Sequence, residues 1–206
     1  MENKKLKFIL ASASPRRKEL LSFLNIPFTI LTKNIPEVSH FTNPIEFSKD
    51  ISEQKGKAVF QDLVQNAFVV SADTIVCLGN KIYGKPSDEN EARIFLTELA
   101  DKTHSVFTAV TLNLRMDGVV KTYSFVEESK VHFNHINQLL LDNYIRTGDS
   151  LDKAGAYGIQ GPSLTFISRV EGDYANVVGF PLSRFILECD EFFKPFLKGQ
   201  SWQDLF

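Results

Sequence analysis

The sequence predicts an α/β protein whose β-sheet contains both parallel and antiparallel strands. Apolar runs of strand length alternate with segments that carry helix caps and a helical spacing of apolar residues. Hairpins interrupt this alternation, most clearly where Asp117-Gly118 joins two long strand candidates. Because hairpins make antiparallel neighbours and strand–helix alternation makes parallel ones, we expect a mixed sheet. With 206 residues, 43% of them hydrophobic, the chain fits one globular domain.

The elements of the first half follow from local signals. We expect strands over 7–10, 28–32, 67–70, 74–78 and 81–83, and helices over 15–24 and 44–63. Asn43-Pro44-Ile45-Glu46 places a cap, a proline and an acid in the order that opens a helix, although Gly56 weakens that helix locally. Gly79-Asn80 predicts a tight hairpin turn.

The second half shows the same kinds of signal. Asp88 with Glu91 opens a helix whose apolar residues share one face up to Leu99, and Asn137 caps a short helix that runs to Arg146. The long strands span 105–115 and 119–133, a glycine-bearing loop spans 148–162, and a further strand spans 164–170. Pro181 opens a final helix that ends near Phe193.

Composition excludes several classes of function. The net charge is -2 and there is no basic stripe, so a nucleic-acid-binding module fits poorly. No apolar run approaches the roughly 20 residues that span a bilayer, and residues 1–5 lead into a segment too short for the core of a signal peptide. Cys77 and Cys189 are too few for a disulfide framework and lack metal-ligand spacing. We therefore expect a cytoplasmic protein without membrane binding.

The segment 11–17, Ala-Ser-Ala-Ser-Pro-Arg-Arg, follows an apolar strand and opens a helix. Ser14 is a natural N-cap, and Pro15 suits the first helical position because its missing N–H leaves no donor unpaired. The helix N-terminus and the guanidiniums of Arg16 and Arg17 would suit a phosphate. Alone, the segment favours a phosphate site and an ordinary capped surface helix equally.

Asp73 lies where an apolar strand, 67–70, gives way to polar residues. Open α/β sheets collect ligands at strand ends, so an acid there would suit a divalent metal or accept a proton from water. An isolated Asp caps a turn more often, so this signal is weak alone.

Two loops carry further candidates. Gly84-Lys85-Pro86 places a lysine between two residues that fix the backbone, although alone this pattern is typical of an ordinary loop. The loop 152–161 carries three glycines and Gln160, whose amide offers the donor and acceptor that base recognition requires. It lacks the spacing of a P-loop, and its Ala, Ile and Tyr favour a packed loop.

Other polar residues give little signal alone. Glu37 in a loop and Lys55 on a helix would each be interpreted as solvated surface. The histidines show no catalytic or ligand spacing and are interpreted as structural: His40, His104, His132 and His135.

Five segments together resemble the Maf family of nucleoside triphosphate pyrophosphatases. In the family's order and spacing they are Ser-Ala-Ser-Pro-Arg-Arg (12–17), Ser-Ala-Asp-Thr (71–74), Gly-Lys-Pro (84–86), Asp-Lys-Ala-Gly-Ala-Tyr-Gly-Ile-Gln-Gly (152–161) and Asn-Val-Val-Gly-Phe-Pro-Leu (176–182). The resemblance spans roughly 7–190 and implies a single domain over 1–206, with a tail at 195–206 whose Trp202 and Phe206 would pack on the body or on a partner. It implies an elongated, twisted mixed sheet with flanking helices that form two lobes around a cleft, of the inosine-triphosphate-pyrophosphatase-like kind.

The resemblance also implies an activity and a set of site residues. The activity is hydrolysis of a nucleoside triphosphate to the monophosphate and pyrophosphate by water attack at the α-phosphate, with a divalent cation (Mg²⁺, Mn²⁺ or Co²⁺). The residues that would contact the phosphates are Ser12, Arg16, Arg17, Lys55, Lys85 and Lys153, of which Lys85 would also be catalytic. Glu37 and Asp73 would be catalytic and hold the metal, and Asp73 would be the proton acceptor. The arrangement that resembles the subgroup acting on dTTP and UTP is Arg16, Thr74 and Gln160.

Two departures from the family pattern are visible. Pro36 precedes Glu37 where relatives often have a second acid, so metal affinity is expected to differ, and Phe180 stands where Leu is usual. A cation beside Asp73 would lower its pKa and weaken it as a base. Whether Asp73 ligates metal, orients water or takes the proton therefore stays open at this point.

A function of another class would use the same cleft: a nucleotide-binding regulator of septum formation and cell division without turnover. The presence of both acids favours the enzyme. The resemblance further implies house-cleaning of non-standard nucleotides, a nucleoside triphosphate as the main partner, no stable nucleic-acid binding, and a homodimer as the common state of such clefted enzymes.

Overall fold

The computed structural model describes residues 6–197 and 199–206, and the expectation for residues 1–5 lies outside them. Its strands are β1 (Lys7–Leu10), β2 (Thr29–Ile30), β3 (Ala67–Leu78), β4 (Lys81–Tyr83), β5 (Thr103–Met116), β6 (Val119–Phe133) and β7 (Ile167–Glu171). Its α-helices are α1 (Pro15–Ser22), α2 (Pro44–Phe60), α3 (Glu89–Leu99), α4 (Gln138–Arg146), α5 (Tyr174–Val178) and α6 (Leu182–Phe193). Short 3-10 helices span Ala154–Ala156, Pro162–Thr165, Lys194–Phe196 and Trp202–Leu205. None of the helices in these described ranges is long and apolar enough to cross a bilayer.

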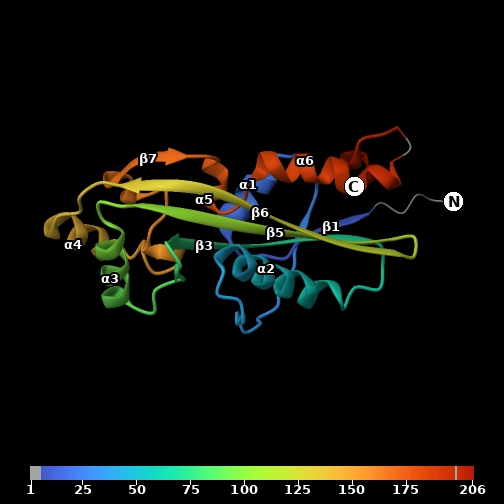
Figure 1. The fold of residues 1–206 in the computed structure, drawn as a ribbon. Coiled ribbons are helices and arrows are strands. Elements are labelled where there is room, and N and C mark those ends of the chain that lie inside the picture. The colour runs from blue at the N-terminus through green and yellow to red at the C-terminus, as the bar shows by residue number, and fades with distance from the viewer. Residues whose placement is uncertain (1–5, 198) are drawn as a thin grey trace.

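The strands form one elongated, twisted sheet with helices on both faces (Figure 1). The strand order is β2-β1-β3-β5-β6-β7, and β4 also pairs with β3. β1 pairs in parallel with β2 and β3, whereas the other pairs are antiparallel. The predicted mixed sheet is therefore confirmed. Figure 1 shows α2 on one side of the long strands and α1 and α6 on the other.

Helix starts agree with the sequence because they depend on local caps. The side-chain oxygen of Asn43 accepts the N–H groups of Ile45 and Glu46 at 3.0 and 3.3 Å. Asp88 caps α3 by accepting the N–H of Glu91 at 2.8 Å. Asn137 caps α4 in the same way. Each cap satisfies a backbone donor that the first helical turn leaves free.

Several predicted bounds were wrong. Helix α1 ends at Ser22, α2 ends at Phe60, β2 covers only Thr29–Ile30, and residues 162–165 form a 3-10 helix before β7. Helix α5, between β7 and α6, was not predicted. Tertiary packing as well as local propensity sets where an element ends, so such bounds are the least predictable from sequence.

β3 is one continuous strand through Asp73, whereas the sequence predicted two separate strands, 67–70 and 74–78. Residues 67–77 of β3 pair with 105–115 of β5 without interruption. That ladder satisfies the backbone on one edge of β3, and contacts from other elements satisfy its polar side chains. The expectation that Asp73 stands at the end of its own strand is therefore wrong.

Asp73 instead lies beyond the end of a neighbouring strand. β1 pairs with β3 only up to Val70, and β4 begins pairing at Val76. Within the described residues, 71–75 of β3 therefore lack a strand on this edge. This gap in the sheet leaves room for the cavity described below.

The gap is also a polar band between apolar cores. On one face of the sheet, β3 residues up to Ala72 pack in a core with β1 and α6, and Val76 packs in a second core with α3 and α4. On the other face, Val69 and Ile75 belong to two smaller cores. Because neighbouring strand residues point to opposite faces, the polar side chains of 71–74 interrupt the apolar packing on both.

Helix α2 lies close to the sheet at Gly56. A Cβ atom on Gly56 would lie 2.5 Å from Ser71 Oγ and 2.6 Å from Asn113 Nδ2. Both distances are too short for a Cβ atom, so only glycine fits at this position. Beside it, Ser52 and Ser71 each donate a hydroxyl hydrogen bond to the other's backbone carbonyl. The glycine that weakens the helix locally is thus what allows its close contact with β3, and it brings Lys55 to the gap.

The C-terminal tail packs on the body, as one of the two expected outcomes. Trp202 is buried, and its ring stacks on Phe193 with centroids 5.9 Å apart. The ring centroids of Phe206 and Phe8 lie 5.2 Å apart, and the N–H of Leu6 donates to the carbonyl of Leu205. Both ends of the described chain therefore close the same core, next to β1.

Candidate active site

A cavity of about 1010 Å³ lies along the free edge of β3. Its walls come from the β1–α1 connection, the loop before α2, the loop after β4, the glycine-bearing loop 148–162 (the glycine loop) and the end of α5. The residues that the sequence assigned to the site all line it: Ser12, Arg16, Arg17, Glu37, Lys55, Asp73, Thr74, Lys85, Lys153 and Gln160. Their individual roles stay predictions.

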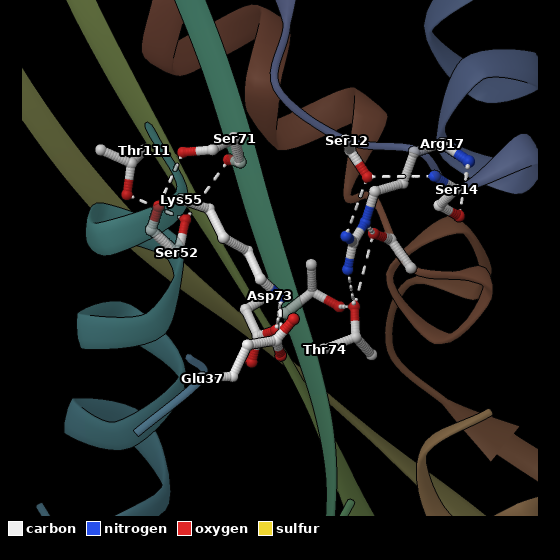
Figure 2. Close-up of polar contacts among 12 residues, drawn as sticks. Ser12, Ser14, Arg17, Glu37, Ser52, Lys55, Ser71, Asp73, Thr74 and Thr111 are labelled. Carbon is white, nitrogen blue, oxygen red and sulfur yellow. Dashed lines mark hydrogen bonds and ion pairs between the residues drawn. The ribbon is translucent and has the colours of Figure 1, made fainter. Parts of the chain in front are cut away.

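The floor of the cavity holds two carboxylates joined by one ammonium group (Figure 2). Lys55 Nζ lies 2.7 Å from Asp73 Oδ1 and 2.9 Å from Glu37 Oε2. The side chain of Asp73 is 9% exposed and that of Lys55 18%, whereas Glu37 is 55% exposed. Interpreting Lys55 alone as solvated surface was therefore wrong.

The electrostatics of Asp73 follow from its burial. Removal from water raises the pKa of Asp73 above its usual 3.8, and the negative charge of Glu37 adds to that rise. The ion pair with Lys55 and the charge of Arg17 act in the opposite direction, but burial prevails. A raised pKa makes the carboxylate a stronger base.

Arg17 stands on the other face of β3 from Lys55 (Figure 2). Its guanidinium donates to the carbonyl of Gly179 at 2.9 Å, to Ser12 Oγ at 3.2 Å and to Thr74 Oγ1 at 2.9 Å. Ser14 caps α1 by accepting the N–H of Arg17 at 3.4 Å. Consecutive residues of β3 thus face different walls of the cavity, Asp73 toward α2 and Thr74 toward α1.

The glycine loop supplies a third wall, where aspartate side chains pair with the lysine and the arginine that were predicted to contact phosphates. Lys153 Nζ contacts the carboxylates of Asp149 at 2.9 Å and Asp152 at 2.6 Å. Asp152 also reaches across to Arg16, at 3.2 Å. The loop and the N-terminus of α1 are therefore joined by one carboxylate.

Lys85 and Gln160 are exposed at the rim. Among the described residues, no hydrogen bond or ion pair holds either side chain. Both are therefore free to meet a ligand. Over the whole cavity, six basic side chains face four acidic ones, so the site carries a positive balance although the chain is net negative. That balance favours a polyanion.

No separate signal in the sequence marked Asp149 and Asp152, although Asp152 opens the segment 152–161 and Asp149 lies four residues before Lys153. Nothing in the sequence marked Thr108, and Asn176 and Gly179 stand in the segment 176–182 with no role assigned to them; the contacts of all three lie across the sheet. Spacing along the chain does not reveal partners from distant strands.

His104, interpreted from the sequence as structural, anchors the glycine loop. Its Nε2 lies 2.7 Å from the hydroxyl of Tyr157, and its ring packs edge-on against Phe133. Burial lowers the pKa of His104 from 6.5 to about 3, with a smaller contribution from the charge of His132.

This histidine predicts acid sensitivity. Its folded-state pKa is depressed, so between about pH 6.5 and about pH 3 the unfolded chain binds a proton that the folded chain does not, and stability falls as pH falls. Between about pH 7 and about pH 5 the free energy of unfolding should drop by about 2 kcal/mol from this residue. Urea denaturation at both pH values measures the drop, and a His104→Asn variant should show less of it. An equal drop in both proteins would contradict the assignment.

Known proteins similar to this chain identify its family. The family model of the Maf-like protein matches residues 7–192. The chain belongs to this family. A relative from Thermoanaerobacter sp. (strain X514), "dTTP/UTP pyrophosphatase", is 42% identical over 87% of this chain and 93% of its own length. The "dTTP/UTP pyrophosphatase" of Bacillus cytotoxicus is 41% identical over 90% of this chain and 95% of its own. A solved HAM1 protein from Coxiella burnetii aligns with a TM-score of 0.40 and 15% identity over 77% of this chain and 90% of that one, a likeness too distant to bear on function.

Proposed function

We propose that this Maf-family protein is a pyrophosphatase that hydrolyses dTTP and UTP to the monophosphate and pyrophosphate. The observation that carries the proposal is the cavity itself, where a buried carboxylate paired with a lysine lines the same space as the arginines of α1. The names of the relatives support the substrates. No contact in the cavity favours a regulator without turnover, because both acids of the predicted chemistry face the same space.

The donor set fits a divalent cation. Glu37 and Asp73 already converge on one positive charge, that of Lys55, and carboxylate oxygens suit hard cations such as Mg²⁺. No cluster of three or more His, Cys, Asp or Glu side chains with metal-site geometry occurs in residues 6–197 and 199–206. Two carboxylates are enough for Mg²⁺, which binds with water and substrate phosphates as its remaining ligands. Bound there, the cation would neutralise phosphate oxygens and lower the pKa of water.

The chain's own residues would accept the proton and hold the triphosphate. Asp73 Oδ1 accepts the Lys55 ammonium, and among the described residues Oδ2 has no hydrogen-bond partner. Oδ2 is therefore the atom that we assign to take the proton of the attacking water. Fixed cations on the facing walls would hold the triphosphate and stabilise the charge that gathers on the pyrophosphate leaving group.

Gln160 is proposed to recognise the pyrimidine edge, since its exposed amide at the rim offers both a donor and an acceptor. We expect Gln160→Ala to reduce the preference for dTTP over dATP by roughly tenfold, the effect of one or two lost hydrogen bonds. Steady-state kinetics with both nucleotides measure this ratio, and Gln203→Ala in the tail serves as a control. An unchanged ratio would remove Gln160 from base recognition.

The proposed function is tested by pyrophosphate release from a panel of triphosphates with Mg²⁺, each assayed in parallel for orthophosphate. We expect stoichiometric pyrophosphate and monophosphate, fastest with dTTP and UTP. Nucleotide binding without release of either product would favour the regulator, and orthophosphate as the product would place the cleavage elsewhere.

A further inference from the structure

The hydroxyl of Thr74, on the central strand, is already engaged by protein groups. It accepts a hydrogen bond from Arg17 Nη2 at 2.9 Å and lies 2.9 Å from Oγ1 of Thr108, its cross-strand partner on β5. Thr108 is fully buried and donates to the backbone carbonyl of Asn176 at 3.0 Å. Thr74 thus connects a cavity-lining arginine to residues that lie behind the cavity wall.

The direction of these hydrogen bonds follows from the groups at the two ends. Arginine only donates and a carbonyl only accepts. Since Thr108 gives its proton to the carbonyl of Asn176, the proton of Thr74 points to Thr108. The other acceptor near Thr74, the carbonyl of Gly179, lies at 3.5 Å and makes a weaker bond. The hydroxyl of Thr74 is therefore not available as a donor to a nucleotide base.

The last residue in this series of hydrogen bonds, Asn176, is itself anchored to the sheet. Asn176 donates from Nδ2 to the carbonyl of Val106 and to Ser129 Oγ, which fixes α5 on the sheet. Three residues later, Gly179 adopts φ +124 and its carbonyl accepts Arg17 Nε. The guanidinium of Arg17 is thus held from two directions by the segment 176–179 of α5 and the turn after it.

We propose that Thr108 is a positioning residue for substrate binding: through Thr74 it fixes the guanidinium of Arg17 to receive the phosphate chain. Thr74 then acts on the phosphates through Arg17 and makes no direct contact with the base. The inference rests on the proposed function for its substrate, and it extends the site to a residue that does not line the cavity.

The test uses valine variants that keep shape and remove the hydroxyl. Thr108→Val should raise the KM for dTTP on the order of fivefold, the effect of one lost hydrogen bond, and change kcat less. Thr74→Val should act similarly, and the double variant should be no worse than the stronger single one, because both break the same chain. Thr108→Ser, which keeps the hydroxyl, should restore the wild-type KM, whereas Thr122→Val on β6 should leave it unchanged. Thermal melts confirm that each variant is folded.

A second probe separates this inference from the proposed function. Calorimetric titration with inorganic tripolyphosphate needs no turnover and no base, and Thr108→Val and Thr74→Val should weaken its binding by about the same factor as for dTTP. If the wild-type protein released no pyrophosphate but these losses appeared, the proposed function would fail and the positioning role would stand. If Thr108→Val bound tripolyphosphate and dTTP like wild type, or if Thr74→Val weakened dTTP alone, the positioning role would be overturned.

Discussion

Replacing Asp73 with asparagine is expected to reduce pyrophosphate release by roughly 10²–10⁴-fold, the usual contribution of a general base. Asparagine keeps the size of the side chain, and its oxygen can still accept the Lys55 ammonium that now lies 2.7 Å from Oδ1. It cannot take a proton from water. Nucleotide affinity should persist, because the variant removes a negative charge from a cavity that receives a polyanion.

Single-turnover kinetics separate the two effects, with dTTP affinity measured by calorimetry. Asp190→Asn is the matched control, because Asp190 is exposed on α6, away from the cavity residues. The melting temperature of Asp73→Asn should not fall, since the neutral amide avoids the burial cost that raises the pKa of the acid. Near-wild-type turnover would exclude Asp73 from proton transfer.

Of the proposed substitutions, Lys55→Met should lower the free energy of unfolding the most. The substitution leaves the carboxylate of Asp73, 9% exposed, without its partner. Breaking a buried pair costs about 3–5 kcal/mol. Because Lys55 is 18% exposed and the cavity admits water, we expect a loss of about 2–3 kcal/mol at neutral pH. Turnover should fall as well, since the variant loses a cation that faces the phosphates.

The pH dependence of that loss has a defined sign. Without the ammonium, the pKa of Asp73 rises further, so the folded variant binds a proton that the unfolded chain releases above its ordinary value of 3.8. The stability deficit should therefore be smallest near that value and grow as pH rises. Urea denaturation over this range measures it, with Lys57→Met, exposed on the same helix, as control. Adding Asp73→Asn to Lys55→Met should recover most of the loss, whereas a deficit independent of pH and of Asp73 would contradict the ion-pair explanation.

The starts of helices could be predicted from the sequence because the deciding contacts are local. Asn43 and Asp88 cap helices whose next residues supply the N–H groups. The continuity of β3 could not be predicted in this way. Ser71 and Asp73 are residues typical of a turn, and they remain in a strand because β5 pairs with its backbone and α2 supplies partners for the side chains.

The same limit applies to the site. The resemblance to a family selected ten residues that share one cavity, but no local rule pairs Lys55 with Asp73 or Arg17 with Gly179. The first pair depends on the close approach of α2 at Gly56, which propensity alone marks as a weakness. The second depends on α5, a helix of five residues that has Gly179 as its C-cap and is bonded to the sheet through the side chain of Asn176.

Hydrolysis in ¹⁸O-labelled water tests most directly whether the cavity directs water to the α-phosphorus. With dTTP and Mg²⁺, we expect the label in thymidine monophosphate and none in pyrophosphate. The Asp73→Asn protein should incorporate label into neither product over the same time. Label in pyrophosphate or in orthophosphate would show attack at another phosphorus and would contradict the proposed chemistry of this site.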